Sequence, residues 1–331
     1  MSAKIKKKCF KRGLLFGFLG IIVLLYLFLL ILPFPELNNY RERSYGTVIC
    51  DRSGNVLRVL PASDGVKREW SPLSEIPPGA VKILIRSEDR RFYFHFGVDV
   101  FSLARSVYRN LKARRIVSGA STITMQLARL IHPHSGGMGG KIAEAWDALR
   151  LEAKLSKKEI LELWLNGIPF GSNIEGLPAI CRARFGRTIR ELDDNRAALL
   201  ASVPRRPQFY DPALNPEAAV SAAMALSKRN KLSLREDELI KAATEAVRPA
   251  AIVDPRTPFF APHFTERLAG SSITPAGNMK TTLDFALQRY AEEELSLELS
   301  LISRNRVRNG AILAIENESG AVRTNHRRRD S

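Results

Sequence analysis

The sequence predicts a mainly helical protein that follows a single N-terminal membrane helix and contains one small β hairpin. Three observations support this fold class: an uncharged apolar stretch at 13–32, two β-prone runs within 47–60, and several later segments with apolar residues at helical spacing. Hydrophobic residues make up 45% of the 331 residues. That fraction suffices for a folded core and excludes a chain that is disordered throughout.

The apolar stretch is long enough to cross a bilayer. Residues 13–32 carry no charge, and 20 residues at about 1.5 Å each span about 30 Å, the thickness of the hydrocarbon core. A cleaved signal peptide would have a shorter apolar region and a small-x-small site after it, whereas Pro-Phe-Pro-Glu follows at 33–36. Six cations precede the stretch: Lys4, Lys6, Lys7, Lys8, Lys11 and Arg12. We therefore predict an uncleaved single-pass anchor, with residues 1–12 in the cytoplasm and the remaining chain outside.

The chain is strongly basic, with a net charge of +17 and a sequence pI of about 10.1. This charge predicts attraction to nucleic acid, anionic lipid or a diphosphate. Export across the membrane removes most nucleic-acid partners and places the domain against an anionic lipid surface, so a membrane-held substrate is favoured. Cys9, Cys50 and Cys181 show no metal-ligand spacing and resemble small apolar residues, with a Cys50–Cys181 disulfide as an open alternative.

The first elements after the anchor lead to a helix that ends on an acid. Residues 47–50 and 56–60 flank a turn-forming stretch, which is typical of a hairpin. Residues 80–88 have apolar residues at helical spacing and predict a helix with Glu88 at its C-terminal end. A further helix is predicted over 99–112, with Phe101, Ala104, Val107, Tyr108 and Leu111 on one face.

Helical periodicity continues beyond a second polar cluster. Residues 121–131 predict a helix, 135–140 a flexible glycine-rich break, and 141–166 the longest periodic stretch. One stripe expected to be buried there contains Ile142, Ala145, Trp146, Leu149 and Ala153, and a second contains Leu155, Ile160, Leu163 and Trp164. Ser156, followed by Glu159, predicts a capping box at the start of a separate helix.

Two polar clusters lie among these helices. The first is Glu88-Asp89-x-x-Phe92-x-x-His95-x-Gly97-x-Asp99, and the second is Gly119-x-Ser121-Thr122-Ile123-Thr124-x-Gln126. Carboxylates, hydroxyls and an amide beside many cations suit a phosphate-bearing substrate better than an ordinary core. Lys141 and Glu144 share one helix face, although alone they would form only a weak surface ion pair.

These clusters resemble the first two motifs of the family 51 peptidoglycan glycosyltransferases, which form the N-terminal half of class A penicillin-binding proteins. Lys141-x-x-Glu144 resembles the third motif, and Lys157-x-x-Ile160-Leu161-Glu162 resembles the fourth. The resemblance covers residues 45–215 well and implies a lysozyme-like, mainly helical domain. Residues 280–288 resemble the connector before a transpeptidase domain. Because the sequence contains no Ser-x-x-Lys or Lys-Thr-Gly, we expect truncation before that domain and no transpeptidase activity.

The resemblance also implies an order of domains and a location. The expected order is a cytoplasmic tail (1–12), a transmembrane anchor (13–32), a segment with the hairpin (33–80), the glycosyltransferase domain (81–250), and a linker with the truncated start of a transpeptidase domain (251–331). The chain would lie in the bacterial plasma (inner) membrane, with its catalytic domain on the periplasmic or extracellular side.

The implied activity is polymerisation of lipid II into glycan strands with release of undecaprenyl pyrophosphate. Glu88 would be the catalytic acid/base, and Glu144 with Lys141 would support the pyrophosphate side. Phe92, Phe94 and Phe96 could partly desolvate Glu88 and raise its pKa toward the working range. The expected substrate-binding residues are Asp89, Ser121, Thr122, Thr124, Gln126, Arg129, Lys141 and Lys157, and the expected motif scaffold is Phe92, His95, Gly97 and Gly119. For Ser121 and Thr122 the alternative is capping of the following helix.

The expected partners are lipid II, the growing glycan strand, an anionic lipid surface and other cell-wall synthesis proteins, without nucleic acid. No metal-binding residue and no required cofactor is predicted, although a divalent cation such as Mg²⁺ could accompany the pyrophosphate.

Three residues depart from the family pattern. Gly140 stands in place of the third-motif arginine, Met125 in place of a glutamine, and Arg196 in place of a glutamate. They motivate an alternative function, a catalytically impaired or non-enzymatic membrane-anchored cell-wall scaffold. A glycan hydrolase of similar shape is a third hypothesis, and cations such as Arg129, Lys141, Lys154 and Lys157 argue against it.

Overall fold

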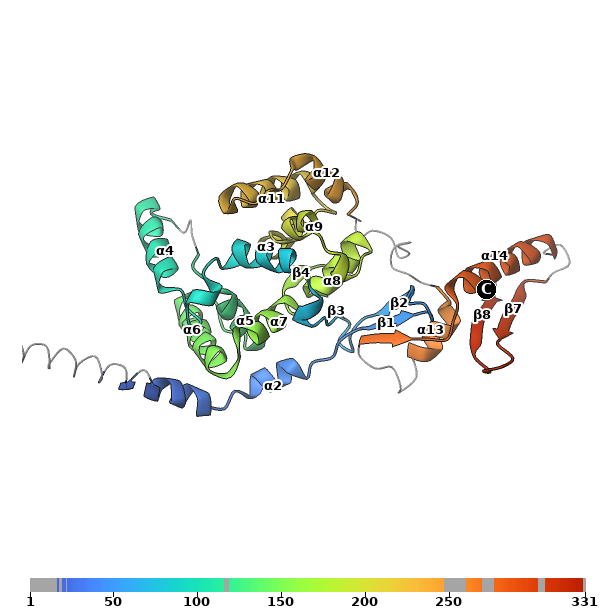
Figure 1. The fold of residues 1–331 in the computed structure, drawn as a ribbon, viewed down its shortest axis with the longest axis horizontal. Coiled ribbons are helices and arrows are strands. Elements are labelled where there is room, and N and C mark those ends of the chain that lie inside the picture. The colour runs from blue at the N-terminus through green and yellow to red at the C-terminus, as the bar shows by residue number, and fades with distance from the viewer. Residues whose placement is uncertain are drawn as a thin grey trace, which may run out of the picture. The chain divides into compact units, whose positions relative to one another are not determined.

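A computed structural model of the chain describes residues 17, 20, 21, 23–115, 119–246, 260–269, 277–302 and 307–329. Helices dominate these residues, as Figure 1 shows, which confirms the prediction of a mainly helical protein. The chain divides into two compact units, each built from two stretches of sequence: Met1–Arg43 with Ile85–Gly167, and Ser44–Leu84 with Ile168–Ser331. The domain boundaries expected from the sequence at 80 and 250 stay a prediction.

Helices make up the first unit. After α2 (Pro35–Arg41), it contains the end of α3 (Pro78–Glu88), the short 3-10 helix η2 (Phe92–Phe94), α4 (Val100–Ala113), α5 (Ile123–Ile131), α6 (Gly137–Lys154) and α7 (Lys157–Leu165). Helix α5 packs against α2, α6 and α7, and its residues Ile123, Leu127 and Ala128 are fully buried. Because apolar burial is the main stabilising contribution in a fold of this size, α5 is the centre of this unit.

Most helices of this unit lie where the sequence predicts them. The predicted spans 80–88, 99–112 and 121–131 correspond to α3, α4 and α5. The capping box at the start of α7 is confirmed: the Ser156 hydroxyl accepts from the Glu159 backbone N–H at 3.3 Å, and the Glu159 carboxylate accepts from the Ser156 N–H at 2.8 Å. The apolar face predicted for α4 exists but is exposed, with Phe101 at 71% and Leu111 at 73%.

The predicted orientation of α6 is wrong. Ile142 and Trp146, expected in the core, are 66% and 40% exposed. Ala153 is the one residue of the expected stripe that is buried. The buried face carries Gly140, Glu144, Asp147, Ala148, Leu151, Glu152 and Ala153. Three of these residues are acids that contact a cation, a hydroxyl or a histidine from other segments: Glu144 with Arg129, Glu152 with Thr124, and Asp147 with His132. The spacing of apolar residues alone therefore predicted the wrong face of α6 as the buried one. The helix also begins at Gly137, within the stretch 135–140 that was expected to be a flexible break.

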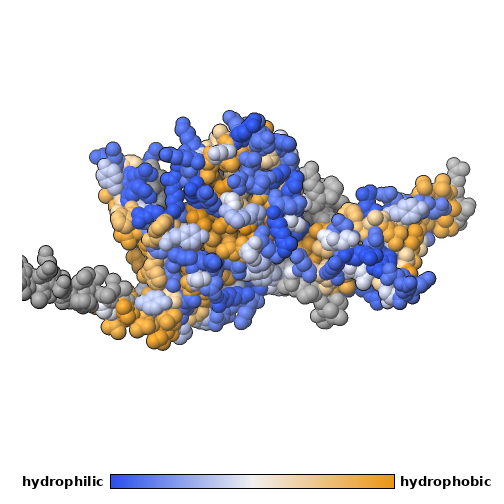
Figure 2. Space-filling view, in the orientation of Figure 1, coloured by the Kyte–Doolittle hydropathy of each residue, from blue (hydrophilic) through white to orange (hydrophobic). Residues whose placement is uncertain are grey.

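The expected membrane anchor falls partly outside the described residues. Within the described part, the chain is helical at Val23–Ile31, and most of its large apolar side chains are exposed, among them Leu24 at 67% and Ile31 at 79%. No single helix among the described residues is long and apolar enough to span a bilayer. The helices Val23–Ile31 and Pro35–Arg41 are long and apolar enough when taken together, but the chain bends by 58° between them. Figure 2 shows the hydrophobic surface of the first of these helices at lower left.

Short strands and helices build the second unit. Its strands are β1 (Thr47–Cys50), β2 (Val56–Leu60), β3 (Lys67–Arg68), β4 (Pro169–Gly171), β5 (Ile174–Glu175), β6 (Gly277–Lys280), β7 (Asn309–Ile315) and β8 (Val322–Arg329). Its helices are η1 (Leu73–Glu75), α8 (Leu177–Phe185), η3 (Ile189–Glu191), α9 (Asp194–Leu200), η4 (Val203–Arg205), α10 (Pro207–Tyr210), α11 (Pro216–Asn230), α12 (Glu236–Thr244), α13 (Pro262–Ala269) and α14 (Phe285–Ile302), together with most of α3.

The predicted hairpin is confirmed within this unit. Strands β1 and β2 pair antiparallel, and β6 joins β1 in parallel to give the order β2-β1-β6. Asp51 holds the turn, since its carboxylate accepts the backbone N–H groups of Ser53 and Asn55 at 2.8 Å. Ile49 and Leu57 from the hairpin pack with Ala261 and Leu283 in a small core.

The two described cysteines are free thiols. Cys181 is fully buried, and burial raises the pKa of its thiol to about 12, so the group stays protonated and unreactive. Cys50 lies at the end of β1 and forms no disulfide. This supports the interpretation of both as small apolar residues, while Cys9 lies outside the described residues.

Candidate active site

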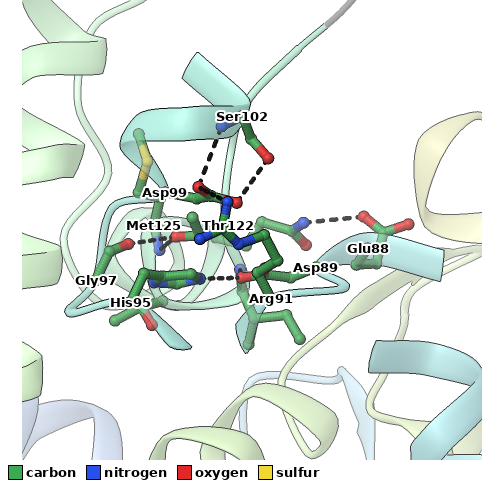
Figure 3. A network of polar contacts seen from close by, with 12 residues as sticks. Glu88, Asp89, Arg91, His95, Gly97, Asp99, Ser102, Thr122 and Met125 are labelled. Carbon is green, nitrogen blue, oxygen red and sulfur yellow. Dashed lines mark hydrogen bonds and ion pairs between the residues drawn. The ribbon is translucent and has the colours of Figure 1, made fainter. Parts of the chain in front are cut away.

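Glu88 ends α3 and is held by a side chain from α5. The Gln126 amide nitrogen donates to Glu88 Oε2 at 2.9 Å. The other end of the same amide, Gln126 Oε1, accepts from the Trp164 indole N–H at 3.2 Å. Because an indole nitrogen can only donate, it fixes the amide with its NH₂ group toward Glu88. Figure 3 shows Glu88 together with the loop that follows it.

Asp89 ties that loop to the start of α5. Its side chain is buried, and Oδ2 accepts from the Ile123 backbone N–H at 3.1 Å and contacts His95 Nε2 at 2.9 Å. An acid at the N-terminus of a helix interacts favourably with the unpaired N–H groups and the helix dipole. Asp89 and His95 thus order the segment between Glu88 and α5, as Figure 3 shows. The scaffold role expected for His95 stays a prediction.

Gly97 is required by the close approach of α6. Its φ is +78°, and a Cβ built there would lie 2.9 Å from the Ala148 carbonyl oxygen. The Gly97 carbonyl accepts a hydrogen bond from the Thr122 hydroxyl at 2.5 Å. The same Thr122 oxygen caps α5 by accepting from the Met125 N–H at 3.1 Å. The hydroxyl of Thr122 is therefore used by the scaffold, in line with the capping alternative.

Asp99 begins α4 in the same way. Its carboxylate accepts from the N–H groups of Phe101 and Ser102 at 3.1 Å and from the Ser102 hydroxyl at 2.6 Å. Burial alone would raise the pKa of Asp99, but the hydrogen bonds from Ser102 and the charge of Arg91 hold it below the usual value. Asp99 is thus an ionised cap under ordinary conditions.

The expected aromatic enclosure of Glu88 is wrong. Only Phe92 of the three phenylalanines is buried, whereas Phe94 is 80% and Phe96 45% exposed. Phe92 instead packs beneath the ammonium group of Lys157, whose nitrogen lies 4.5 Å from the ring centroid. Phe92 and Phe94 stand at the two ends of the short helix η2 and differ in burial, while Phe96 lies beyond it, and adjacency in sequence could not show this difference.

Glu144 lies in a cluster in which cations outnumber acids. The side chain of Glu144 is buried, and its Oε2 accepts from Lys141 Nζ at 2.7 Å, while Arg129 lies 3.9 Å from Oε1. Lys141 also donates to the Ser121 hydroxyl at 3.3 Å. The side chains of Lys141 and Arg129 are 44% and 51% exposed, so both can meet an anion from solvent.

Helix α5 brings the two expected catalytic acids to one surface. Gln126 contacts Glu88, and Arg129 lies beside Glu144. Residues three apart on a helix have Cβ atoms about 5–6 Å from each other and share a face. Both carboxylates therefore approach the same face of one helix, although they come from α3 and α6.

Two other expected substrate-binding residues are bonded inside the protein. The Thr124 hydroxyl donates to Glu152 Oε1 at 2.7 Å and is fully buried. Lys157 Nζ donates to the same Glu152 oxygen at 2.6 Å and to the His95 carbonyl at 2.8 Å. Glu152 was missed from the sequence, where it looks like any helix acid. Gly119 is exposed, with no atom within 4 Å of a Cβ built there.

The structure gives a local reason for two departures from the family pattern. A Cβ at Gly140 would overlap the Ser135 carbonyl oxygen, so a side chain there requires the chain before α6 to move. Arg196, on α9 in the second unit, forms ion pairs with Asp193 and Glu245. Met125 is buried at 7% exposure, and nothing in its surroundings explains the loss of a polar residue there.

A further group of titratable residues was missed. His132 Nδ1 and His134 Nε2 lie 2.9 and 2.8 Å from Asp147 Oδ2, and Arg150 donates to Asp147 Oδ1 at 2.7 Å. Burial would raise the pKa of Asp147, but its hydrogen bonds to His134, Arg150 and His132 hold it below the usual value. The sequence signal was His-Pro-His at 132–134, followed by an acid on the next helix.

Comparison with known proteins places these residues in a family. The transglycosylase family model matches residues 53–231, more than half of the chain. Curated relatives include penicillin-binding protein 1C of Escherichia coli K12, 36% identical over 79% of this chain and 33% of that protein, and penicillin-binding protein 1A of Aquifex aeolicus, 31% identical over 88% of this chain and 42% of that protein. Penicillin-binding protein 2D of Bacillus subtilis is 37% identical over 70% of this chain and 36% of that protein.

The chain spans between 33% and 42% of the length of these three relatives. Among solved structures, a crystal structure of penicillin-binding protein 1A from Haemophilus influenzae aligns with 84% of this chain and with 33% of its own chain. The TM-score is 0.35 and the sequence identity is 16%. That likeness is too weak to support a structural argument. The family match extends over the whole site described above, from Glu88 to Lys157. On this evidence the chain belongs to the transglycosylase family.

Proposed function

We propose that this chain is a peptidoglycan glycosyltransferase that polymerises lipid II into glycan strands and releases undecaprenyl pyrophosphate. The observation that carries the proposal is that Glu88 and Glu144 contact residues three apart on α5, Gln126 and Arg129, with Lys141 beside Glu144. A transfer of this kind needs a base for the attacking sugar hydroxyl and positive charge for the departing diphosphate. Family membership supports the same reaction class.

Glu88 is the proposed general base. In this scheme it takes the proton from the acceptor hydroxyl while the new glycosidic bond forms and the bond to the pyrophosphate oxygen breaks. A single base acting on the acceptor implies inversion at the anomeric carbon. The Gln126 amide holds one carboxylate oxygen at 2.9 Å and so orients Glu88 for that step.

Lys141 and Arg129 are the proposed cations for the leaving group. Each side chain is about half exposed, and Glu144 neutralises only one of the two charges. Glu144 thereby fixes the direction of both cations before the diphosphate arrives. Preorganised charge of this kind acts without reorganisation at the moment of reaction.

The remaining expected substrate-binding residues divide into two groups. Ser121 bonds Lys141 and Gln126 bonds Glu88, so both touch the proposed reacting groups. Asp89, Thr122, Thr124 and Lys157 are bonded to backbone or to buried partners. We assign these four to positioning the loop and the start of α5.

A magnesium ion is not assigned to this site. Its best protein ligands would be carboxylates with free oxygens, as hard cations prefer. Glu144 already pairs with Lys141 and Arg129, and Glu88 accepts from Gln126. These residues do not fit a dedicated Mg²⁺ cage. Any such ion would arrive with the diphosphate of the substrate.

The membrane location belongs to the same proposal. The helix Val23–Ile31 carries exposed apolar side chains, and the cationic residues precede it. The end of this helix and the residues after it contact α6 of the same unit, where Lys154 Nζ donates to the Leu30 carbonyl at 2.7 Å and Arg150 contacts the Pro33 carbonyl. We therefore infer a single-pass anchor in the bacterial plasma membrane, with the N-terminus inside and the site held near membrane-bound lipid II.

A scaffold without activity is the second candidate function, and Gly140 is the observation that favours it. The residue supplies no cation where the family motif has arginine, and a side chain there would overlap Ser135. Polymerisation of purified lipid II separates the two candidates. We expect wild type to form glycan and release pyrophosphate, and Glu88→Gln to fall to background. Equal background product from both proteins supports the scaffold.

A further inference from the structure

We propose that His132, His134 and Asp147 form a binding site for a zinc-class divalent cation, distinct from the residues assigned to glycosyl transfer. We call these three residues the histidine–aspartate cluster. His132 caps the C-terminal end of α5, His134 lies in the loop after it, and Asp147 projects from α6. Each residue offers one ligand atom, and the three atoms all lie within 4.8 Å of one another.

The distances from the two histidine nitrogens to Asp147 Oδ2 are close to those of a zinc site. Both imidazole nitrogens already converge on Asp147 Oδ2, at 2.9 Å for His132 and 2.8 Å for His134. Tetrahedral zinc with bonds of about 2.0–2.2 Å holds neighbouring ligand atoms about 3.3–3.5 Å apart. The two contacts therefore need to widen by only about 0.5 Å, within the reach of side-chain rotation.

Surrounding residues hold the carboxylate in the orientation that a metal ligand needs. Arg150 Nη1 binds Asp147 Oδ1 at 2.7 Å and leaves Oδ2 to the histidines. Ligating carboxylates are commonly fixed by such an outer hydrogen bond. Asp147 itself is 2% exposed, whereas the His132 side chain is 40% exposed. The cluster thus has a rigid inner ligand and an open side through which an ion and a water ligand can enter.

The donor set selects the class of cation. Imidazole nitrogens favour Zn²⁺, Co²⁺, Ni²⁺ or Cu²⁺, whereas Mg²⁺ and Ca²⁺ prefer sites made of oxygen atoms. The positive charge of Arg150 nearby further disfavours ions that bind only by charge. Two histidines with one aspartate leave a fourth position for water on tetrahedral zinc.

The site connects two parts of the first unit. Arg150, which binds Asp147, also contacts the Pro33 carbonyl, and its guanidinium lies 3.9 Å from the centroid of the Phe34 ring. A bound ion would crosslink the end of α5 to α6 and, through Arg150, would order the segment that follows the apolar helix. It would raise the thermal stability of the protein by binding the folded state only.

Metal binding by the full chain, in detergent and without a histidine tag, tests this proposal. After removal of metal with EDTA, we expect wild type to bind one Zn²⁺ per chain in a calorimetric titration, and excess Mg²⁺ not to displace it. Co²⁺ as a probe should give the visible absorption of a tetrahedral site. His132→Ala and His134→Ala should each weaken Zn²⁺ binding at least tenfold, because loss of even an outer partner lowers affinity about 10–100-fold.

The matched control is His263→Ala, which removes an exposed histidine of α13. It should bind Zn²⁺ as wild type does. Retention of one tight Zn²⁺ by the double variant His132→Ala/His134→Ala, with a wild-type circular dichroism spectrum, overturns the assignment. If that variant does not fold, wild type alone decides: absence of the Co²⁺ absorption band, or displacement of Zn²⁺ by Mg²⁺, rejects the site.

Discussion

Substitution of Gly97 by alanine tests whether the loop after Glu88 is held as described. Its φ of +78° disfavours any residue with a Cβ by about 1–2 kcal/mol. The new methyl would also lie 2.9 Å from the Ala148 carbonyl oxygen and 3.0 Å from its carbon, and such overpacking costs about 1–3 kcal/mol. Together these effects predict a loss of about 2–5 kcal/mol in the free energy of unfolding.

Thermal unfolding of the full chain in detergent, followed by tryptophan fluorescence, measures this loss. A destabilisation of this size corresponds to a fall in Tm on the order of 10 °C. Gly119→Ala is the matched control, because no atom lies within 4 Å of its Cβ and its φ is not in the left-handed region. It should change stability by no more than about 0.5 kcal/mol. Equal effects of the two substitutions would refute the reasoning.

Coupling between Gly97 and Thr122 gives a second readout of the same loop. The Thr122 hydroxyl donates to the Gly97 carbonyl at 2.5 Å, so displacement of the loop by a methyl group also breaks this bond. Thr122→Ala in the Gly97→Ala background should therefore destabilise less than Thr122→Ala in wild type. The difference is expected at about 0.5–3 kcal/mol in a double-mutant cycle. Strict additivity would mean that the loop does not move.

Three further predictions concern charge, pH and the missing arginine. Lys141→Gln should lower kcat/KM for lipid II about 10²–10³-fold through loss of charge at the leaving group. Lys158→Gln, at an exposed position of α7, should leave kcat/KM unchanged, and equal kcat/KM for the two variants would exclude Lys141 from that role. The pKa of Asp99 in the folded protein lies below its ordinary value of 3.8. The ionised carboxylate therefore stabilises the fold fully above pH 3.8, and this stabilisation is lost as the pH falls through the pKa of the folded state. The Tm gap between wild type and Asp99→Ala should therefore shrink on acidification, while Asp99→Asn keeps the helix cap. Gly140→Arg restores the motif residue but meets the Ser135 carbonyl, so Tm should fall and polymerisation should not rise; a faster, equally stable variant would contradict this.

Local patterns in the sequence predicted the elements that depend on neighbouring residues. The hairpin at 47–60 and the capping box at Ser156 follow from turn chemistry and spacing within a few positions, and both are confirmed. Gly97 was expected as scaffold, although only the structure shows that the backbone of α6 approaches it. Thr122 as a helix cap was an open alternative, and its hydrogen bonds support it.

Features that depend on distant segments could not be predicted in this way. Helix α6 has apolar residues at helical spacing on one face and acids on another. The acidic face is buried because Arg129, Thr124 and His132, from α5 and its C-terminal cap, contact its acids. Periodicity records only apolar spacing, so Ile142 was placed inside. The histidine–aspartate cluster was missed for a related reason, since its members meet only when α6 packs against α5.

The fixed amide of Gln126 restricts where a proton accepted by Glu88 can travel. Behind the acid lie an amide and then the Trp164 indole, and neither group takes up a proton near neutral pH. The path through Gln126 is therefore closed to proton relay, whereas the other carboxylate oxygen, Oε1, accepts from the Ser87 hydroxyl at 3.4 Å. In the proposed mechanism, Glu88 therefore passes its proton on through a group other than Gln126, such as the Ser87 hydroxyl or water.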